Sequence, residues 1–217
     1  AINAFGGRID VMINNAGIST RTFARNTSAY TDQYLMQVDY LAHVALTKAV
    51  LPTMESQSEA CIINIGSVAS KIPAPVRSAY VAAKHALHGF MRTLIVETHL
   101  TDNTHIHILD IILGSTKTTL PSKAVVDVSK DGKITPYGKE DANTAKGLDP
   151  TWVAERILSV AHGRKLHESW MAPHKELLGV TLNQYMPQAS MKILVKAFAK
   201  QYAVQGSSST TASKKDS

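Results

Sequence analysis

Apolar and polar residues follow one another along the chain in blocks that predict strands separated by helices. Three short apolar runs have the length of buried strands, at residues 9–13, 61–65 and 106–113. Between them, apolar residues recur at helical spacing over 29–51, which ends before Pro52, and over 80–99. Strands that alternate with helices imply right-handed crossovers and one parallel sheet. The pattern therefore predicts an α/β fold.

The second half of the chain is less regular. Residues 115–147 are polar and contain Lys, Asp, Gly and Pro, so they have the size of a substrate loop or lid. Asp149 fits the N-cap of a helix over 151–162, and Thr27 and Ser28 are N-cap candidates for the helix that begins at residue 29. Two further segments are predicted, a short strand at 170–173 and an amphipathic helix at 176–203 that breaks near Pro187.

Length and composition fit one globular domain. The chain has 217 residues, of which 44% are hydrophobic and 18% charged, enough to bury a single core. We expect residues 1–205 to form this domain and the Ser- and Thr-rich residues 206–217 to be a disordered tail. The chain begins at Ala1, in what looks like the end of a helix broken at Gly6 and Gly7, so we expect further sequence upstream.

The charge and the rare residue types exclude several classes of protein. The net charge of +6 arises mainly near the C-terminus, which favours a solvated tail or contact with an anionic membrane. No stripe of interleaved aromatic and basic residues indicates nucleic acid binding, and no apolar run is long enough to span a membrane. The lone Cys61 lies in an apolar run and is interpreted as a core residue. The nine His residues form no metal-binding pattern.

The residues most suggestive of chemistry lie between 62 and 90. Tyr80 and Lys84 are four positions apart on a predicted helix, so they share one face. Ser67 follows the preceding strand, thirteen positions before Tyr80. An ammonium beside a phenol favours the phenolate, which general base catalysis at neutral pH requires. This spacing predicts a site for proton transfer.

Other small and polar residues are expected at the same end of the sheet. Asn15, Ser67 and Gly114 each follow the carboxyl end of a predicted strand. In parallel sheets these ends form one rim, and ligands bind beyond it. The sequence therefore predicts a single ligand site along this rim.

These motifs resemble those of a known family. Asn14-Asn15-Ala16-Gly17, then Ser67, then Tyr80 and Lys84 match, in order and spacing, the short-chain dehydrogenase/reductase family of the classical type. Within the family, the segment from Tyr80 and the region 170–202 are similar to the dehydrogenase/reductase member 7 group. The resemblance covers roughly the C-terminal two-thirds of a family domain. It implies a Rossmann-like, doubly wound parallel sheet that lacks the N-terminal strands.

The resemblance implies an NAD(P)-dependent oxidoreductase that interconverts an alcohol and a carbonyl by hydride transfer. Tyr80 would be the acid/base, Lys84 would also hold the nicotinamide ribose, and Ser67 would bind the reacting oxygen. NADP is slightly favoured over NAD, and the group suggests a lipid, steroid or retinoid as the small-molecule substrate. The residues that the resemblance assigns to cofactor binding are Asn15, Ala16, Gly17, Tyr80, Lys84, Gly114, Thr116 and Thr118.

The sequence departs from the family pattern at two positions. Leu113 replaces a Pro before Gly114, which removes a fixed φ from the turn. Asp39 replaces an Asn that supports a water relay to the catalytic Lys. A carboxylate accepts hydrogen bonds but cannot donate as an amide does, and its charge would blunt the effect of Lys84 on Tyr80. We therefore expect Asp39 to belong to the catalytic set and to alter activity.

The sequence contains no Gly-rich phosphate loop and no residue that selects NAD or NADP. We therefore expect this chain alone to bind a dinucleotide poorly, to be inactive as a fragment, and to leave a central strand exposed. The alternative is a truncated, non-catalytic binding or interaction protein. The intact set of Ser67, Tyr80 and Lys84 favours the enzyme.

Assembly and location follow from the resemblance as well. Helices 29–51 and 80–99 correspond to those that form the usual homodimer of the family. The member 7 group is associated with the endoplasmic reticulum membrane, and the last four residues, 214–217, match a dilysine retrieval signal. The expected location is the endoplasmic reticulum membrane, with the cytoplasm as the alternative.

Overall fold

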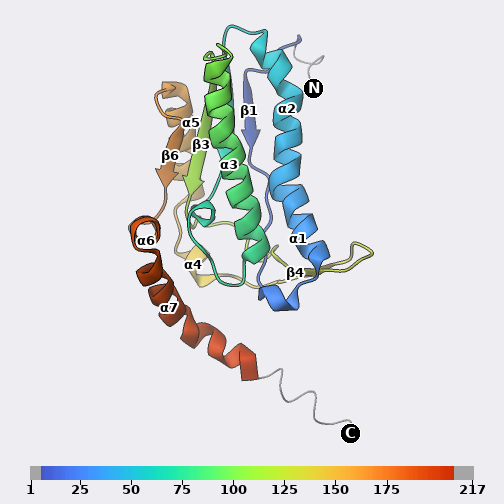
Figure 1. The fold of residues 1–217 in the computed structure, drawn as a ribbon, viewed down its shortest axis with the longest axis vertical. Coiled ribbons are helices and arrows are strands. Elements are labelled where there is room, and N and C mark those ends of the chain that lie inside the picture. Colours follow the sequence, from blue (N-terminus) through green and yellow to red (C-terminus); the bar gives the residue numbers. More distant parts are fainter. Residues whose placement is uncertain (1–5, 208–217) are drawn as a thin grey trace.

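A four-stranded parallel sheet lies at the centre of the protein (Figure 1). The computed structural model describes the backbone of residues 6–207, and the sheet has the strand order β1-β2-β3-β6. The strands are β1 (Val11–Asn14), β2 (Ala60–Ile65), β3 (Ile106–Leu113) and β6 (Glu168–Met171). All three neighbouring pairs are parallel. The predicted α/β fold is confirmed, and β3 has the predicted bounds.

Helices cover both faces of this sheet. Figure 1 shows α2 and α3 in front of the sheet and α5 behind it. The helices in front are α1 (Ala29–Met36), the π-helical turn η3 (Gln37–Leu41), α2 (Ala42–Glu55) and α3 (Ser78–Leu100). The short turns and later helices are η2 (Ala24–Asn26), η4 (Val68–Ser70), α4 (Ala142–Ala145), α5 (Pro150–Gly163), α6 (His174–Tyr185) and α7 (Pro187–Ser207).

The core has two layers because successive side chains on a strand point to opposite faces. In front, Met54, Leu87 and Met91 from the helices pack on Ile62 and Ile108. Behind, the buried residues that pack together with α5 are Cys61, Ile63, Leu109, Ile111 and Met171. The prediction that Cys61 is a core residue is confirmed, since only 3% of it is exposed.

The prediction that the first helix ends before Pro52 is wrong. The helical path runs from Ala29 through a π-helical turn and past Pro52 to Glu55. Proline at this point removes one backbone hydrogen bond near the end of the helix. Met54 is fully buried in the front core layer, and its burial compensates for that loss.

The polar stretch 115–147 is not only a loop. It contains an antiparallel hairpin, β4 (Val125–Val128) and β5 (Ile134–Pro136), and the short helix α4. Ala124 and Val125 are buried, and the backbone N–H of Val125 donates to Ser19 O at 2.7 Å. The hairpin therefore packs on the segment that follows β1. This long-range contact cannot be predicted from the sequence of the hairpin itself.

The start of α1 is capped differently from the prediction. Ser28 precedes the helix, but its side chain forms no cap and instead donates to Val128 O at 2.5 Å. Asp127 Oδ1 accepts from the backbone N–H of Ser28 at 2.9 Å and from Thr31 Oγ1 at 2.7 Å. These hydrogen bonds lower the pKa of Asp127. The Asp127 carboxylate from the hairpin thus accepts hydrogen bonds at the start of α1, where the helix dipole favours a negative charge.

Strand β1 lies at one edge of the described sheet and is exposed on one side. Val11 and Ile13 are 53% and 51% exposed, while Asn14 is buried. The apolar pattern alone wrongly predicts a fully buried strand. The expectation of an exposed strand, drawn from the family resemblance, agrees with this exposure. Gly6 and Gly7, with positive φ values of 63° and 82°, form the turn before β1.

The C-terminal helices lie beside the domain. Helices α6 and α7 meet at Pro187, as predicted, and α7 extends away from the sheet in Figure 1. Residues 206 and 207 belong to α7, whereas the rest of the expected tail, 208–217 with its dilysine, lies outside the described residues. Within residues 6–207, no helix is both long enough and apolar enough to cross a membrane.

The close packing of the front core layer predicts that a cavity there lowers the stability of the fold. Leu87→Ala should lower the free energy of unfolding by about 3 kcal/mol, because Leu87 is fully buried and the site cannot collapse completely. Leu100→Ala, on the same helix but 79% exposed, is the control and should cost less than about 0.5 kcal/mol. Urea denaturation of both variants checks this, and equal losses would contradict the described packing.

Candidate active site

Ser67 lies just beyond the carboxyl end of β2. Its hydroxyl oxygen accepts from the backbone N–H of Ala69 at 3.1 Å, so Ser67 caps the short turn η4. Its carbonyl oxygen accepts from Ser70 Oγ at 2.6 Å. Ser67 is 9% exposed, and these bonds hold it in one orientation at the rim of the sheet.

Tyr80 and Lys84 lie one turn apart on α3 and are both buried, with 8% and 5% exposed. Lys84 Nζ lies 5.9 Å from the centroid of the Tyr80 ring. The ammonium donates to Ile65 O at 3.2 Å, and Ile65 is the last residue of β2. The structure therefore brings Tyr80 and Lys84 to the end of the strand that leads to Ser67.

Asp39 is fully buried in the π-helical turn η3. Its Oδ1 accepts from the backbone N–H of Ile18 at 2.8 Å. A side-chain carbon placed at Gly17 would lie 3.0 Å from Asp39 Oδ1 and 3.7 Å from Lys84 Nζ. Asp39 and Lys84 thus face each other across Gly17, and a side-chain carbon there would crowd Asp39 Oδ1. Such π-helical turns occur frequently at functional sites.

The electrostatics of Asp39 and His43 depend on burial. Burial raises the pKa of Asp39 to about 6, although the positive charge of Lys84 and the Ile18 N–H oppose this shift. One helical turn later, His43 is 2% exposed, and burial together with repulsion from Lys84 lowers its pKa to about 4. His43 was not predicted from the sequence. Its spacing of four residues from Asp39 is the signal that could have found it.

The residues expected to bind the cofactor lie along the same rim but differ in environment. Asn15 and Ala16 are exposed after β1, and Gly17 lies beside Lys84. Gly114 directly follows β3, and its N–H donates to Met171 O at 2.9 Å. Two more residues of this set, Thr116 and Thr118, lie beyond Gly114. Thr116 Oγ1 donates to Gly114 O at 3.2 Å, and Thr118 is exposed.

Asn14 ties the sheet to the helix in front of it. Its Nδ2 donates to Thr47 Oγ1 at 3.0 Å, and both side chains are buried. Thr47 lies on α2, two turns after Asp39. This contact gives Asn14 a structural role and helps to set the position of the helical segment that carries Asp39.

A polar network behind Ser67 was not predicted. Asp110 is fully buried on β3, with its carboxylate 2.6 Å from both Asn64 Nδ2 and His88 Nδ1. Lys71 Nζ lies 2.7 Å from His88 Nε2. An ammonium can only donate, so Nε2 accepts and Nδ1–H donates to Asp110. The network ties the loop after Ser67 to the sheet and to α3.

His88 and Asp110 also lie near Glu168, and the three could supply ligands to a metal ion. Two cations already approach Glu168, however: Lys71 Nζ at 3.5 Å and Arg92 Nη1 at 3.5 Å. These side chains balance the two carboxylates of the group. We therefore describe the group as an ionic network of the fold.

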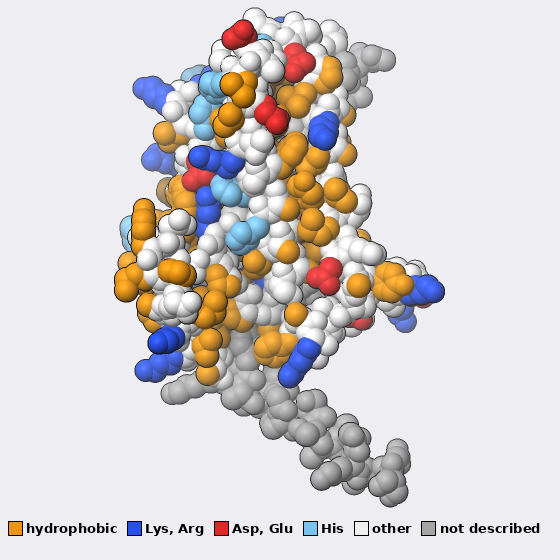
Figure 2. Space-filling view, viewed as in Figure 1, with side chains coloured by type: hydrophobic (Ala, Val, Ile, Leu, Met, Phe, Trp, Pro, Cys, Tyr) orange, Lys and Arg blue, Asp and Glu red, His pale blue; other side chains and the backbone are white. Residues whose placement is uncertain are grey.

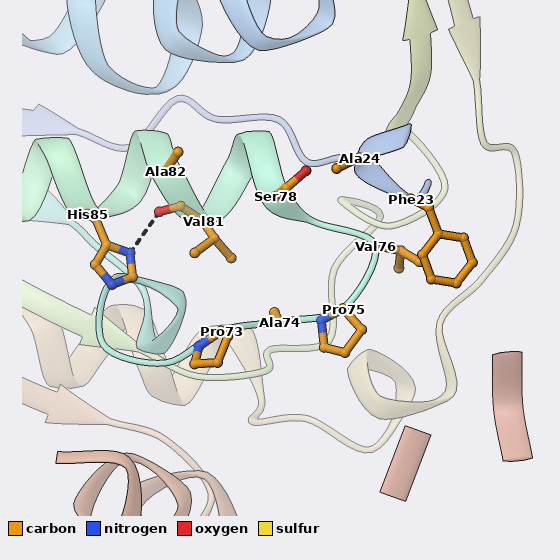
Figure 3. Close-up of a pocket in the computed structure, with 10 residues that line it drawn as sticks. All are labelled: Phe23, Ala24, Pro73, Ala74, Pro75, Val76, Ser78, Val81, Ala82 and His85. Atoms are coloured by element: carbon orange, nitrogen blue, oxygen red, sulfur yellow. Dashed lines mark hydrogen bonds between the residues drawn. The ribbon is translucent and has the colours of Figure 1, made fainter. Parts of the chain in front are cut away.

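An open apolar groove lies beside these elements (Figure 3). It has a volume of about 600 Å³ and is lined by Phe23, Ala24, Pro73, Ala74, Pro75, Val76, Ser78, Val81, Ala82 and His85. On α3 it uses residues that flank Tyr80 in sequence, but neither Tyr80 nor Ser67 lines it. The groove is therefore distinct from the cluster around Lys84.

Because Asp39 is buried, we predict that Asp39→Asn stabilises the fold by an amount that depends on pH. The folded chain holds the Asp39 proton more tightly than the unfolded chain, whose carboxyl has the ordinary value of 3.8. Wild-type stability should therefore fall as the pH rises from about 4 to about 6 and then level off. The variant lacks this loss, so its advantage should grow by about 2–3 kcal/mol over that range.

Urea denaturation at pH 4, 5, 6 and 7 measures this difference. Asp32→Asn, at an exposed position on α1, controls for the removal of one charge. A constant difference between Asp39→Asn and wild type at all four pH values would show that the Asp39 carboxylate is not penalised by the fold.

Comparisons with known proteins agree with this geometry. The model of the short chain dehydrogenase family matches residues 1–128. Dehydrogenase/reductase SDR family member 7B of Bos taurus is 36% identical over 90% of this chain and 57% of its own length. The family protein 7-like of Drosophila melanogaster is 39% identical over 70% of this chain and 44% of its own length. The chain thus spans about half the length of these relatives.

Solved structures share the fold. A short-chain dehydrogenase from Streptomyces avermitilis has a TM-score of 0.65 at 21% identity, covering 94% of this chain and 74% of its own. One from Burkholderia cenocepacia, in complex with NADP, has a TM-score of 0.66 at 16% identity, covering 86% and 69%. A 4-hydroxyisoleucine dehydrogenase complexed with NADH has a TM-score of 0.59 at 23% identity, covering 78% and 70%.

The predicted family is therefore confirmed, as is the likeness to its member 7 group. The family model covers more than half of the chain, and the Ser, Tyr and Lys of the motif lie together at the end of a parallel strand. The chain belongs to the short chain dehydrogenase family.

Proposed function

We propose that this protein is an NAD(P)-dependent oxidoreductase that interconverts an alcohol and a carbonyl, with Tyr80 as the acid/base. The observation that carries the proposal is the convergence of Tyr80, Lys84 and Ser67 at the carboxyl end of β2, with the Lys84 ammonium buried and bonded to Ile65 O. A buried ammonium near a phenol is a costly arrangement that a merely structural helix does not need.

The residues present fit the nicotinamide end of such a cofactor. An ammonium has three hydrogens, and among the described residues the Ile65 carbonyl accepts one of them. The other donors of Lys84 would hold the ribose hydroxyls, while Asn15, Ala16 and Gly17 would border the cofactor from the end of β1. Thr116 and Thr118 would contact it from beyond β3. When bound, the nicotinamide supplies or accepts the hydride.

Proton transfer is assigned to Tyr80. In the reductive direction its phenol gives a proton to the carbonyl oxygen, and in the oxidative direction its phenolate removes the proton of the alcohol. The Ser67 hydroxyl already accepts from Ala69 N–H, so its own hydrogen remains available to the substrate oxygen. The Lys84 ammonium lies 5.9 Å from the centroid of the Tyr80 ring, and the Asp39 carboxylate lies beyond Gly17.

The choice between NADP and NAD and the choice of substrate class rest on the family resemblance. NADP is taken first because of the member 7 group, although the structural neighbours include one complex with NADP and one with NADH. A lipid, steroid or retinoid carbonyl is the substrate class that the group suggests. Because the chain spans 57% of the Bos taurus relative, turnover should be tested both in this chain and in any longer protein that contains it.

Tyr80→Phe tests the proposed reaction. In protein that turns over a carbonyl with NADPH or NADH, the variant should lose at least about a hundredfold in kcat, because the proton donor is gone. Cofactor binding, measured by fluorescence of the reduced nicotinamide, should remain. Tyr30→Phe, at an exposed position on α1, is the control and should keep full activity. Persistent turnover by Tyr80→Phe would exclude Tyr80 as the acid/base.

The homodimer is proposed on the front helices. Leu41 and Leu46 are 45% and 56% exposed around the start of α2, and Val96 on α3 is 57% exposed. Figure 2 shows hydrophobic side chains gathered over α2. Such a patch favours association with a second copy. Light scattering should give the mass of a dimer, and Leu46→Glu should give a monomer. A wild-type monomer at micromolar concentration would contradict the dimer.

Membrane association is proposed for α7, in connection with the endoplasmic reticulum. The helix exposes Met191, Ile193 and Val195 by 49–63% and also carries the exposed Lys192 and Lys196. Apolar residues and lysines on one exposed helix fit a membrane interface that carries anionic lipids. The chain should sediment with anionic vesicles more than with neutral ones, and Ile193→Glu should weaken sedimentation. Equal sedimentation with both kinds of vesicle, or with neither, would remove support for the contact.

A further inference from the structure

Two arginines share one carboxylate oxygen outside the cluster around Lys84. Arg77 Nη2 lies 2.7 Å and Arg21 Nη2 lies 3.2 Å from Oδ2 of Asp141. The three side chains are largely buried: Arg77 is 28% exposed, Arg21 7% and Asp141 14%. Two guanidinium groups against one carboxylate leave a surplus positive charge among side chains that are largely buried.

The arginines also keep unused hydrogen-bond donors. The Nε atoms of Arg21 and Arg77 are buried and have no hydrogen-bond partner among the described residues. Burial and the nearby Arg77 lower the pKa of Arg21, although Asp141 opposes this shift. A planar guanidinium presents its donors as a fork that suits a carboxylate or a phosphate. The cluster thus has more positive charge and more donors than Asp141 uses.

Backbone contacts hold both arginines in place. The N–H of Arg21 donates to Val125 O at 3.0 Å. Val76, directly before Arg77, has a φ of 60°, which is strained for a β-branched residue, and its carbonyl accepts from Thr22 N–H at 2.9 Å. The strained turn directs the chain so that Arg77 meets Arg21, which is 56 positions earlier. The two positive groups are therefore preorganised.

The position of the pair relates it to the proposed reaction. Arg77 is the residue directly before α3, and Tyr80 follows three positions later, so their Cα atoms are at most about 11 Å apart. Arg21 follows the turn at Gly17 that borders Lys84. Asp141, in contrast, comes from the polar segment 115–147, directly before α4.

We propose that Arg21 and Arg77 form a subsite for an oxyanion of the substrate, a carboxylate in the first instance, and that the Asp141 side chain occupies this subsite when no substrate is bound. The substrate would then carry its carbonyl and its anionic group on one molecule, as a keto acid does. This assignment of the substrate rests on the proposed function, whereas the binding of an oxyanion by the two arginines does not. The surplus charge, the unused Nε donors and the strained turn all support the subsite.

The test measures binding alone, without cofactor. Levulinate, a keto acid, and its neutral methyl ester are titrated into the whole chain by calorimetry, with inorganic phosphate as a third probe. Asp141→Asn should bind levulinate at least about tenfold more tightly than wild type, because the competing carboxylate is gone. Arg77→Gln should bind it at least about tenfold more weakly than wild type, and no variant should change binding of the ester.

A matched control is Arg25→Gln, which removes the same charge at an exposed position four residues from Arg21 and should leave levulinate binding unchanged. Thermal unfolding confirms that each variant is folded, and Arg77→Lys, which keeps the charge but loses the fork, should lie between wild type and Arg77→Gln. Tighter binding of phosphate than of levulinate would still support the subsite and would assign a phosphate-bearing substrate.

The proposal is overturned if Asp141→Asn does not tighten levulinate binding, or if the ester binds as well as the acid. Asp141 would then only fasten the polar segment to the domain. Because neither cofactor nor turnover enters this measurement, its failure leaves the proposed reaction standing, and a failure of the Tyr80→Phe experiment leaves the subsite standing.

Discussion

The burial of the Lys84 ammonium is the constraint to which the rest of the site is fitted. A buried charge costs several kcal/mol unless polar groups and opposite charges compensate it. Here the Ile65 carbonyl accepts one hydrogen bond, and Asp39 supplies a negative charge across Gly17. The bond to Ile65 sets the register of α3 over the end of β2. Tyr80, one turn earlier, is placed by the same contact.

Asp39 shows that this compensation is incomplete. Its pKa stays near 6 despite the attraction of Lys84 because a fully buried carboxylate loses more hydration than one nearby ammonium and one N–H return. Burial has the opposite effect on His43 and lowers its pKa, and repulsion from Lys84 lowers it further. Charge in this region is therefore set by depth in the fold, and the π-helical turn is what carries Asp39 to that depth.

Position along the chain explains which predictions succeeded. β3 was predicted with its observed bounds because six of its eight residues are apolar, which in an α/β chain indicates a buried strand. Its two polar residues, His107 and Asp110, are buried as well. The end of the first helix was missed because the burial of Met54 outweighs the local effect of Pro52. The cap of α1 was missed because Asp127, its acceptor, comes from a hairpin 99 positions later in the chain than Ser28.

The sequence by itself determined the fold class, the family and the local pair of Tyr80 and Lys84, because spacing of four residues on a helix places two side chains together whatever surrounds them. Only the tertiary structure decided that Asp39 faces Lys84, that Asp110 binds His88, and that two arginines converge on Asp141. Those groups meet because the register of the parallel strands and the packing of the hairpin bring distant segments together. Burial then sets their charge, and burial is not a property of any local stretch of sequence.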